Sequence, residues 1–354
     1  MSSQNIKISI IIPVFNKEQT VRRAAESVLK QGLLPTEYEL LLIDDGSTDT
    51  SIDICRQLAA ENPETIRFFA KKNEGVGPTR NYGIHLAKGE YLCFLDADDY
   101  LKDGGLRSFI DNFYDNRFDI LSYFSTTVID GKEETALKKD IEGKIIYETT
   151  GHKLLGDGYC AKFIWNSLYK KSFLIENGLK FEPFAYSEDF LFNINAMYAN
   201  PLIRQTSSFI YVYITYEGSH QLTKKRNPEA MTSIVFDFLK IYERMGEITK
   251  MMGRKNIPCN MDTIFANAQE PFISRLLSSS ITVKQLREIR KRINATGLNQ
   301  SKSPNKIYRI SRMIINSGYA FPIIKIIYNN IFVSFILPRI DRETGRFSLK
   351  HNKS

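Results

Sequence analysis

Acidic residues gather directly after a hydrophobic segment in the first third of the chain. Asp96, Asp98 and Asp99 follow residues 91–95 (YLCFL). Alternate residues of an extended segment project to one side, so Asp96 and Asp98 can bind a divalent cation together with a diphosphate. The alternative is an aspartate-rich turn in which Asp99 caps a helix. Similar loops elsewhere favour the metal site.

A second acidic loop, residues 44–49 (DDGSTD), follows residues 38–43 (YELLLI). A turn whose side chains cap the next helix is the simplest reading, but a cap explains one acid and not three. The carboxylate of Asp45 could also accept the imide hydrogen of a uracil-like base. Phe15, in the loop after residues 7–13 (KISIIIP), offers that base a ring face.

A third loop, residues 73–81 (NEGVGPTRN), runs into the start of a helix and places Arg80 in its first turn. Backbone amides and a guanidinium group at a helix start are suited to binding phosphate. The glycine spacing fits neither a P-loop nor a dinucleotide fingerprint. The loop therefore indicates phosphate binding of another kind.

These loops follow short runs of β-branched and aromatic residues, which are typical of buried parallel strands. Helical patterns separate the runs, and Asn16 with Gln19 is placed like a capping box before the first helix. The order predicts an α/β fold with a twisted, mostly parallel sheet and helices on both faces. Ligands of such sheets bind at the carboxyl ends of the strands. The four expected strands are residues 7–13, 38–43, 66–70 and 91–95.

The order of these motifs resembles the family 2 inverting glycosyltransferases, which use nucleotide sugars and have a Rossmann-like GT-A fold. The resemblance spans about residues 8–220. It implies that Asp96 and Asp98 bind the ribose, the diphosphate and Mn²⁺ or Mg²⁺, and that Asp189 is the catalytic base. It also implies nucleotide binding by Pro13, Phe15, Asp45, Asn73 and Arg80, and Asn16 lies in the same loops. The matching segments are SIIIPVFNKEQTVRRAAESVLKQ, ELLLIDDGSTDTS, KKNEGVGPTRNYGIHLAKGEYLCFLDADDYL, FIWNSLYKKSFLIENGLKF and YSEDFLFN.

Inverting transfer needs two kinds of chemical assistance. Negative charge grows on the leaving diphosphate, so a metal ion and Arg80 would stabilise it. The acceptor hydroxyl must lose its proton as it attacks, which requires a carboxylate on the opposite side of the sugar. Asp189 is the candidate base. Glu188 is the alternative base, and we expect it instead to hydrogen-bond the acceptor or the sugar.

Two aromatic residues have open roles. Trp165, the only tryptophan, either lines the sugar or acceptor pocket or belongs to the core. His220 either reaches the diphosphate or the metal, or lies on a solvent-facing loop.

The chain is expected to form two parts. Residues 1–226 would be the GT-A catalytic domain, with a nucleotide-binding half of about residues 1–115 and an acceptor half at 116–226. Residues 227–354 would be a mostly helical, basic extension. From residue 271 onward there are 16 Lys and Arg against 3 acidic residues, whereas the rest of the chain has 32 basic and 37 acidic residues. This asymmetry predicts an anionic partner, and without a recognition motif for nucleic acid we expect a membrane surface.

The basic tail, residues 309–346, alternates apolar runs with single charges that are too closely spaced for a bilayer-spanning helix. We expect an interfacial segment whose basic residues meet lipid headgroups. The alternatives are a helical subdomain that packs on the core and a homodimer contact. Four scattered cysteines and no secretory signal predict a cytoplasmic protein, peripheral on the inner face of the membrane. The basic residues in question are Arg309, Arg312, Lys325, Arg339 and Arg342.

The expected function is the metal-dependent transfer of a hexose or N-acetylhexosamine from a nucleotide sugar, UDP-linked by preference. The acceptor would be a glycan, a lipid-linked sugar or a protein in surface polysaccharide or glycoconjugate synthesis. One alternative is a nucleotidyltransferase, which would release pyrophosphate and not a nucleoside diphosphate. The other is a noncatalytic sugar-nucleotide- or glycan-binding protein, in which Asp189 would be dispensable.

Overall fold

The computed structural model describes residues 6–114, 118–129, 131–134, 144–161, 163–184, 187–215, 228–298 and 313–327. The chain divides into two compact units, Met1–Ser219 with Ile257–Cys259, and His220–Asn256 with Asn260–Ser354. The boundary predicted between residues 226 and 227 falls within residues 216–227, which lie outside the described residues. Each unit is described by itself.

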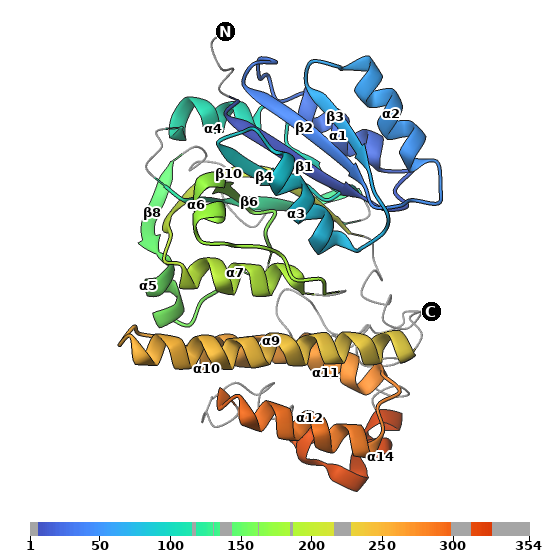
Figure 1. Ribbon diagram of the computed structural model, residues 1–354, viewed down its shortest axis with the longest axis vertical. Helices are drawn as coiled ribbons and strands as arrows, with labels where there is room; N and C mark the ends of the chain where they lie inside the picture. The colour runs from blue at the N-terminus through green and yellow to red at the C-terminus, as the bar shows by residue number, and fades with distance from the viewer. Residues whose placement is uncertain are drawn as a thin grey trace, which may run out of the picture. The chain divides into compact units, whose positions relative to one another are not determined.

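The first unit is built on a sheet of ten described strands (Figure 1). Four parallel strands lie in the order β3-β2-β1-β4. The residues of β1, β2 and β4 are almost all buried, as the continuous apolar sequences of these strands predict. The predicted parallel strands are therefore confirmed. Their bounds are β1 Ile8–Val14, β2 Tyr38–Asp44, β3 Ile66–Ala70 and β4 Tyr91–Phe94.

Helices cover both faces of these strands. Ile10 and Ile12 of β1 belong to the core formed with α1 and α2, whereas Ile11 points to the other face. There Gly83 of α3 lies so close that an added Cβ would come within 2.5 Å of the Ile11 side chain. The first helix begins after Thr20 without a side-chain cap, so the predicted capping box is wrong. These helices are α1 Val21–Leu29, α2 Ser51–Glu61 and α3 Val76–Leu86.

The second half of the sheet is mixed. β9 runs antiparallel to both β4 and β6, and β10 runs parallel to β6. A short strand, β5, pairs antiparallel with β10 and brings the end of the β4 loop beside it. The remaining elements are β5 Tyr100–Leu101, α4 Gly105–Phe113, β6 Ile120–Ile129, β7 Lys132–Glu134, β8 Ile145–Thr150, α5 Gly151–Gly156, β9 Ser167–Lys170, α6 Lys171–Glu176, α7 Glu188–Tyr198 and β10 Leu202–Thr215.

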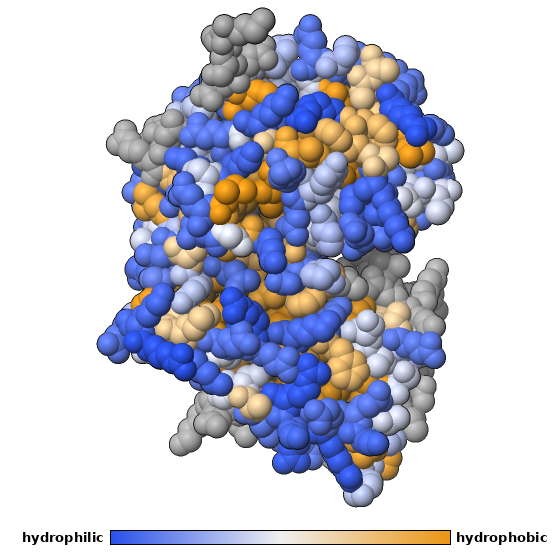
Figure 2. Space-filling view, viewed as in Figure 1, coloured by the Kyte–Doolittle hydropathy of each residue, from blue (hydrophilic) through white to orange (hydrophobic). Residues whose placement is uncertain are grey.

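The second unit is helical, as predicted. The rings of Phe238 and Tyr242 on α9 contact those of Phe265 on α10 and Phe272 on α11, which forms an aromatic core. Hydrophilic residues cover much of the visible surface of the protein (Figure 2). Within the described ranges, no helix has the length and apolar character needed to cross a membrane. The elements are α9 Pro228–Arg254, α10 Met261–Asn267, α11 Gln269–Ser278, α12 Val283–Ala295, η4 Gly318–Ala320 and α14 Phe321–Ile327.

Only residues 313–327 of the basic tail are described. Ile314, Ile315 and Phe321 are buried there, whereas Met313 and Ile323 are exposed. Among the five basic residues expected at headgroups, only Lys325 is described. It donates a hydrogen bond to the Ser279 carbonyl, and its partial burial lowers its pKa. Lys325 therefore has a packing role within the second unit, and the other four lie outside the described residues.

Candidate functional site

The carboxyl ends of β1, β2, β3 and β4 lie at one edge of the sheet. Hydrogen bonds between backbone amides and side chains connect the loops that follow β1, β2 and β3. Asn16 has a left-handed backbone, with φ of 51°. Its amide donates to Ser47 Oγ at 3.0 Å, and its Oδ1 accepts from the Thr48 amide at 2.8 Å. Pro13 lies in β1, and Phe15 at the rim is 46% exposed. The predicted residues of the first two loops are thus brought together.

Asp45 holds the third loop in place. Its Oδ1 accepts from the Glu74 amide at 3.0 Å and from Lys71 Nζ at 2.6 Å, and its Oδ2 accepts from the Gly75 amide at 2.8 Å. Burial of Lys71 opposes its charge, but Asp45 and Glu74 raise its pKa. Asp45 is 3% exposed, and these three hydrogen bonds occupy most of the about four acceptor positions of its carboxylate.

Asn73 lies beside Gly46, a glycine that the turn after β2 requires. Gly46 has φ of +74°, and an added Cβ would lie 2.9 Å from the Asn73 amide nitrogen. A larger residue would therefore displace the loop. The structure places Asn73 beside the Asp45 loop, as the sequence predicts for residues that share one edge.

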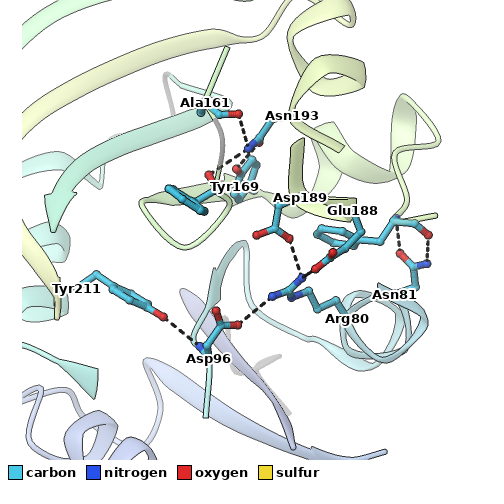
Figure 3. A network of polar contacts seen from close by, with 11 residues as sticks. Arg80, Asn81, Asp96, Ala161, Tyr169, Glu188, Asp189, Asn193 and Tyr211 are labelled. Atoms are coloured by element: carbon cyan, nitrogen blue, oxygen red, sulfur yellow. Dashed lines mark hydrogen bonds and ion pairs between the residues drawn. The ribbon is translucent and has the colours of Figure 1, made fainter. Parts of the chain in front are cut away.

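The guanidinium of Arg80 joins three carboxylates (Figure 3). Arg80 is 3% exposed on α3. Its Nη1 donates to Glu188 Oε1 at 2.6 Å and to Asp189 Oδ1 at 2.7 Å, and its Nη2 donates to Asp96 Oδ1 at 2.9 Å. Asp96 comes from the end of β4 and the other two acids from α7. Arg80 thereby brings the predicted metal ligand and the predicted base into one cluster.

Burial and the neighbouring charges shift the pKa values of the groups in this cluster. Burial opposes the charge on Arg80, but Asp189, Asp96 and Glu188 raise its pKa above the ordinary value. Burial raises the pKa of Asp96, and Arg80 opposes that rise. Burial also raises the pKa of Asp189 to about 8, with Glu188 and Asp96 adding to the effect and Arg80 opposing it. A carboxylate that exchanges its proton near neutral pH is suited to general base catalysis.

The two acids of α7 occupy its first turn, where the helix dipole favours negative charge. Ser187 precedes them with φ of 62°, a left-handed conformation that turns the chain sharply into the helix. Both carboxylates reach the same nitrogen of Arg80. The choice of Asp189 over Glu188 as base stays a prediction.

Asp98 is more accessible than its neighbours. Its side chain is 51% exposed and forms an ion pair with Lys17, whereas the Asp96 side chain is 31% exposed. Divalent cations at phosphate sites often use only one or two carboxylates and take their other ligands from the substrate and water. Two partly open carboxylates on one strand end fit that pattern. Within the described ranges, no three His, Cys, Asp or Glu residues are grouped to hold an ion.

Asp99 is not the helix cap that the sequence allowed. It is 2% exposed, and its Oδ1 accepts from the Ile214 amide at 2.8 Å. Its Oδ2 accepts from the Tyr211 hydroxyl at 2.5 Å, and that hydroxyl accepts from the Asp96 amide at 3.3 Å. Burial raises the pKa of Asp99 to about 7. Sequence reasoning missed Tyr211, because an isolated strand tyrosine carries no chemical signature.

Asn193 is a second residue that sequence reasoning missed. It is fully buried, one helical turn after Asp189 on α7. Its amide nitrogen donates to the carbonyls of Ala161 at 3.2 Å and Phe163 at 3.0 Å, and its oxygen accepts from the Tyr169 hydroxyl at 2.8 Å (Figure 3). Its amide thus fixes the chain before β9 to the helix that carries the acids.

Trp165 is 8% exposed and belongs to the core, as one of the two alternatives held. Its ring stacks on those of Tyr211, Phe163 and Tyr213, with centroids 4.5, 4.9 and 5.7 Å away. Substrate binding by Trp165 stays a prediction. His220 lies outside the described residues.

The chain is similar to two glycosyltransferases that are named for poly(ribitol-phosphate). It is 29% identical over 241 residues to the poly(ribitol-phosphate) beta-glucosyltransferase of Bacillus spizizenii, covering 66% of this chain but 36% of that one. It is 28% identical to the poly(ribitol-phosphate) beta-N-acetylglucosaminyltransferase TarP of Staphylococcus aureus, covering 62% and 67% of the two chains. The chain thus spans about a third of the length of the first relative.

The fold is also found in solved structures. S. aureus TarS 1-349 in complex with UDP-GlcNAc is similar with a TM-score of 0.60 and 19% identity, covering 92% of each chain. This likeness confirms the GT-A fold expected from the motifs. Residues 9–178 match the model of glycosyl transferase family 2. The strand-end loops with Asp45 and Asp96, and the segment that carries Trp165, therefore belong to a family 2 glycosyltransferase domain.

Proposed function

We propose that the protein transfers a sugar from a UDP-sugar to a hydroxyl group of a surface glycan, with inversion at the anomeric carbon. The observation that carries this proposal is the Arg80 cluster, which joins the strand-end Asp96 to Glu188 and Asp189. The donor site and the catalytic base must lie side by side for a single displacement. The names of the relatives and of the UDP-GlcNAc complex support a UDP-sugar donor and a polyol-phosphate acceptor.

The donor nucleotide would lie over the loops that follow β1, β2 and β3. Phe15 would offer its exposed ring to the nucleobase, and Asp45 would accept the imide hydrogen of a uracil base. Asn73 stands beside them. Pro13 and Asn16 shape the floor, because Asn16 ties the first loop to the second. These residues would bind and orient the base and ribose.

The diphosphate would lie at the end of β4. Asp96 and Asp98 would hold Mn²⁺ or Mg²⁺, which offsets the negative charge of the leaving diphosphate. Arg80 keeps Asp96 in place and retains its charge because three carboxylates surround it. We also propose that its guanidinium stabilises the negative charge that develops on the leaving diphosphate.

The attacking oxygen would come from the side of α7. Deprotonated Asp189 accepts the hydroxyl proton as the new C–O bond forms and the bond to the diphosphate oxygen breaks. One displacement of this kind inverts the anomeric carbon. Glu188, held by the same Arg80 nitrogen, would hydrogen-bond the acceptor or the sugar.

The products decide between this function and its alternatives. We would incubate the full chain with UDP-glucose, UDP-galactose, UDP-GlcNAc or UDP-GalNAc and a ribitol-phosphate oligomer, with and without Mn²⁺, and measure UDP and pyrophosphate. Acceptor-dependent UDP release, with an inverted linkage by NMR, is expected. Pyrophosphate release would indicate a nucleotidyltransferase. Binding of UDP-sugars without turnover, unchanged in Asp189→Asn, would indicate a noncatalytic protein.

A peripheral position on the inner face of the membrane would suit a lipid-linked acceptor. The excess of basic residues after residue 271 supports it, because anionic headgroups attract such segments. The packing of Lys325 against Ser279 shows that at least one basic residue serves the fold. Arg309, Arg312, Arg339 and Arg342 are the basic residues that we propose to meet lipid.

A further inference from the structure

Two exposed aromatic rings lie on the buried Trp165. Phe163 is 48% exposed and Tyr213 is 39% exposed, although large aromatic side chains are usually well covered. The planes of both rings are nearly parallel to Trp165, at 18° and 5°. Trp165 itself is 8% exposed and belongs to the core, and both rings stack on it. We call Phe163 and Tyr213 the aromatic platform.

Contacts on two sides connect the platform to the reacting groups. Tyr211, which also stacks on Trp165, accepts a hydrogen bond from the Asp96 amide. Asn193, one helical turn after Asp189, donates to the Phe163 carbonyl at 3.0 Å. Tyr211 thus links the stacked rings to the proposed metal ligand, and Asn193 links Phe163 to the helix that carries the proposed base.

The order of the strands assigns the platform to the acceptor and not to the nucleotide. The nucleotide loops follow β1, β2 and β3, whereas Tyr213 lies on β10 and Phe163 precedes β9. In the sheet order β3-β2-β1-β4-β9-β6-β10, β4, which precedes Asp96, lies between these two groups. An occupant of the platform would approach from the side of β9 and β10.

The chemistry of the platform suits a sugar or polyol unit. Its faces are apolar and uncharged, and the C–H groups of a carbohydrate or polyol chain can pack on them while the hydroxyl groups stay in water. A rigid ring also costs little conformational entropy when it binds.

We propose that Phe163 and Tyr213 bind the acceptor unit next to the attacking hydroxyl, and so determine which acceptor reaches Asp189. This inference rests on the proposed transferase function. The ligand of the platform is an uncharged polyol or sugar residue of the acceptor chain.

The test uses steady-state transfer by the full chain from UDP-GlcNAc or UDP-glucose to a ribitol-phosphate oligomer. Phe163→Ala and Tyr213→Ala should each raise the acceptor KM about tenfold, because each removes a stacking face. The donor Kd, measured by calorimetry, should stay within about twofold. Phe163→Tyr should retain the wild-type acceptor KM. Tyr319→Ala, which removes a ring that is 81% exposed in the second unit, is the matched control and should change neither value.

The single tryptophan gives a readout that does not depend on turnover. Trp165 lies under the platform, so its fluorescence should change when the ribitol-phosphate oligomer binds. The change should require about tenfold more oligomer in Phe163→Ala.

The outcomes separate the platform from the proposed function. Wild-type transfer with an unchanged acceptor KM in both alanine variants would overturn the platform and leave the transferase function standing. If the wild type releases no UDP from any donor, the transferase function fails, and fluorescence alone judges the platform. In that case, the platform is also overturned if the oligomer causes no change in the fluorescence of the wild type.

Discussion

Arg80 Nη1 lies 2.7 Å from Asp189 Oδ1, although the two residues are 109 positions apart in the chain. This ion pair connects the second turn of α3, where Arg80 lies and not in the first turn as predicted, with the start of α7. Through Asp96 it also reaches the loop after β4. The nucleotide half and the acceptor half of the first unit thus meet at one buried cation. The predictions below test the groups around it.

Asp189→Asn should lower transfer about 100-fold or more, because the amide keeps the size of the side chain but cannot accept the acceptor proton. Donor Kd should change little. Single-turnover rates and calorimetry of UDP-sugar binding measure the two effects. Asp157→Asn, which alters an exposed acid paired with Lys153, is the control. A single-turnover rate equal to that of the wild type would remove Asp189 from the role of base.

The pH dependence of transfer should follow the same carboxylate. Burial raises the pKa of Asp189 to about 8, so the group is mostly protonated at pH 6 and cannot act as a base there. We expect kcat/KM for the acceptor to rise with pH, to reach half of its maximum near pH 8 and to level off about one pH unit above that. The residual activity of Asp189→Asn should lack this rise. A profile for the wild type that is flat from about pH 6 to 9 would contradict the assignment.

Asp98→Ala should abolish transfer and metal-dependent nucleotide binding but leave the fold intact, because its side chain is 51% exposed. Thermal melting with titrated UDP and Mn²⁺ tests both parts. The exposed Asp103 in the next turn provides the control variant Asp103→Ala, which should keep the Mn²⁺-dependent rise in Tm. The metal assignment fails if Asp98→Ala keeps that rise undiminished.

Tyr211→Phe should weaken the support of the strand-end loop while keeping the ring that stacks on Trp165. It removes the hydrogen bond to the buried Asp99, which should lower the free energy of unfolding by about 1–2 kcal/mol. The Mn²⁺-dependent affinity for UDP should fall a few-fold as Asp96 loses its fixed position. Chemical denaturation and calorimetry give the two values.

Tyr242→Phe is the matched control for that experiment. It removes a buried hydroxyl that donates to the Ala268 carbonyl in the second unit. It should cost a similar free energy of unfolding and leave UDP affinity unchanged. Equal UDP affinity in Tyr211→Phe and Tyr242→Phe would show that Tyr211 serves stability alone.

The tail should bind anionic vesicles through residues outside its packed part. Replacing Arg309, Arg312, Arg339 and Arg342 by Ala should abolish sedimentation with phosphatidylglycerol vesicles, since each basic residue contributes about 1 kcal/mol near the surface. Binding by the wild type should weaken as salt rises. Substitution is preferable to truncation, because residues 313–327 contribute buried side chains such as Phe321. A wild-type protein that ignores vesicles but forms a dimer in light scattering would replace the membrane hypothesis with the homodimer.

The sequence by itself determined the parallel strands and the loops at their ends. Continuous apolar runs such as β1 and β2 have no stable place except inside a sheet covered on both faces. Because the carboxyl ends of parallel strands share one edge, Asp45 and Asp96 had to come near each other. Local order along the chain was enough for these residues.

Only the tertiary structure decided how Asp99, Tyr211 and Asn193 act. Asp99 bonds a strand more than a hundred residues away and does not cap a helix, which no local pattern indicates. Asn193 looks like any polar residue of a helix until the carbonyls it serves are in place. Hydrogen bonds between distant segments depend on burial and approach, and both are set only when the sheet closes around β9 and β10.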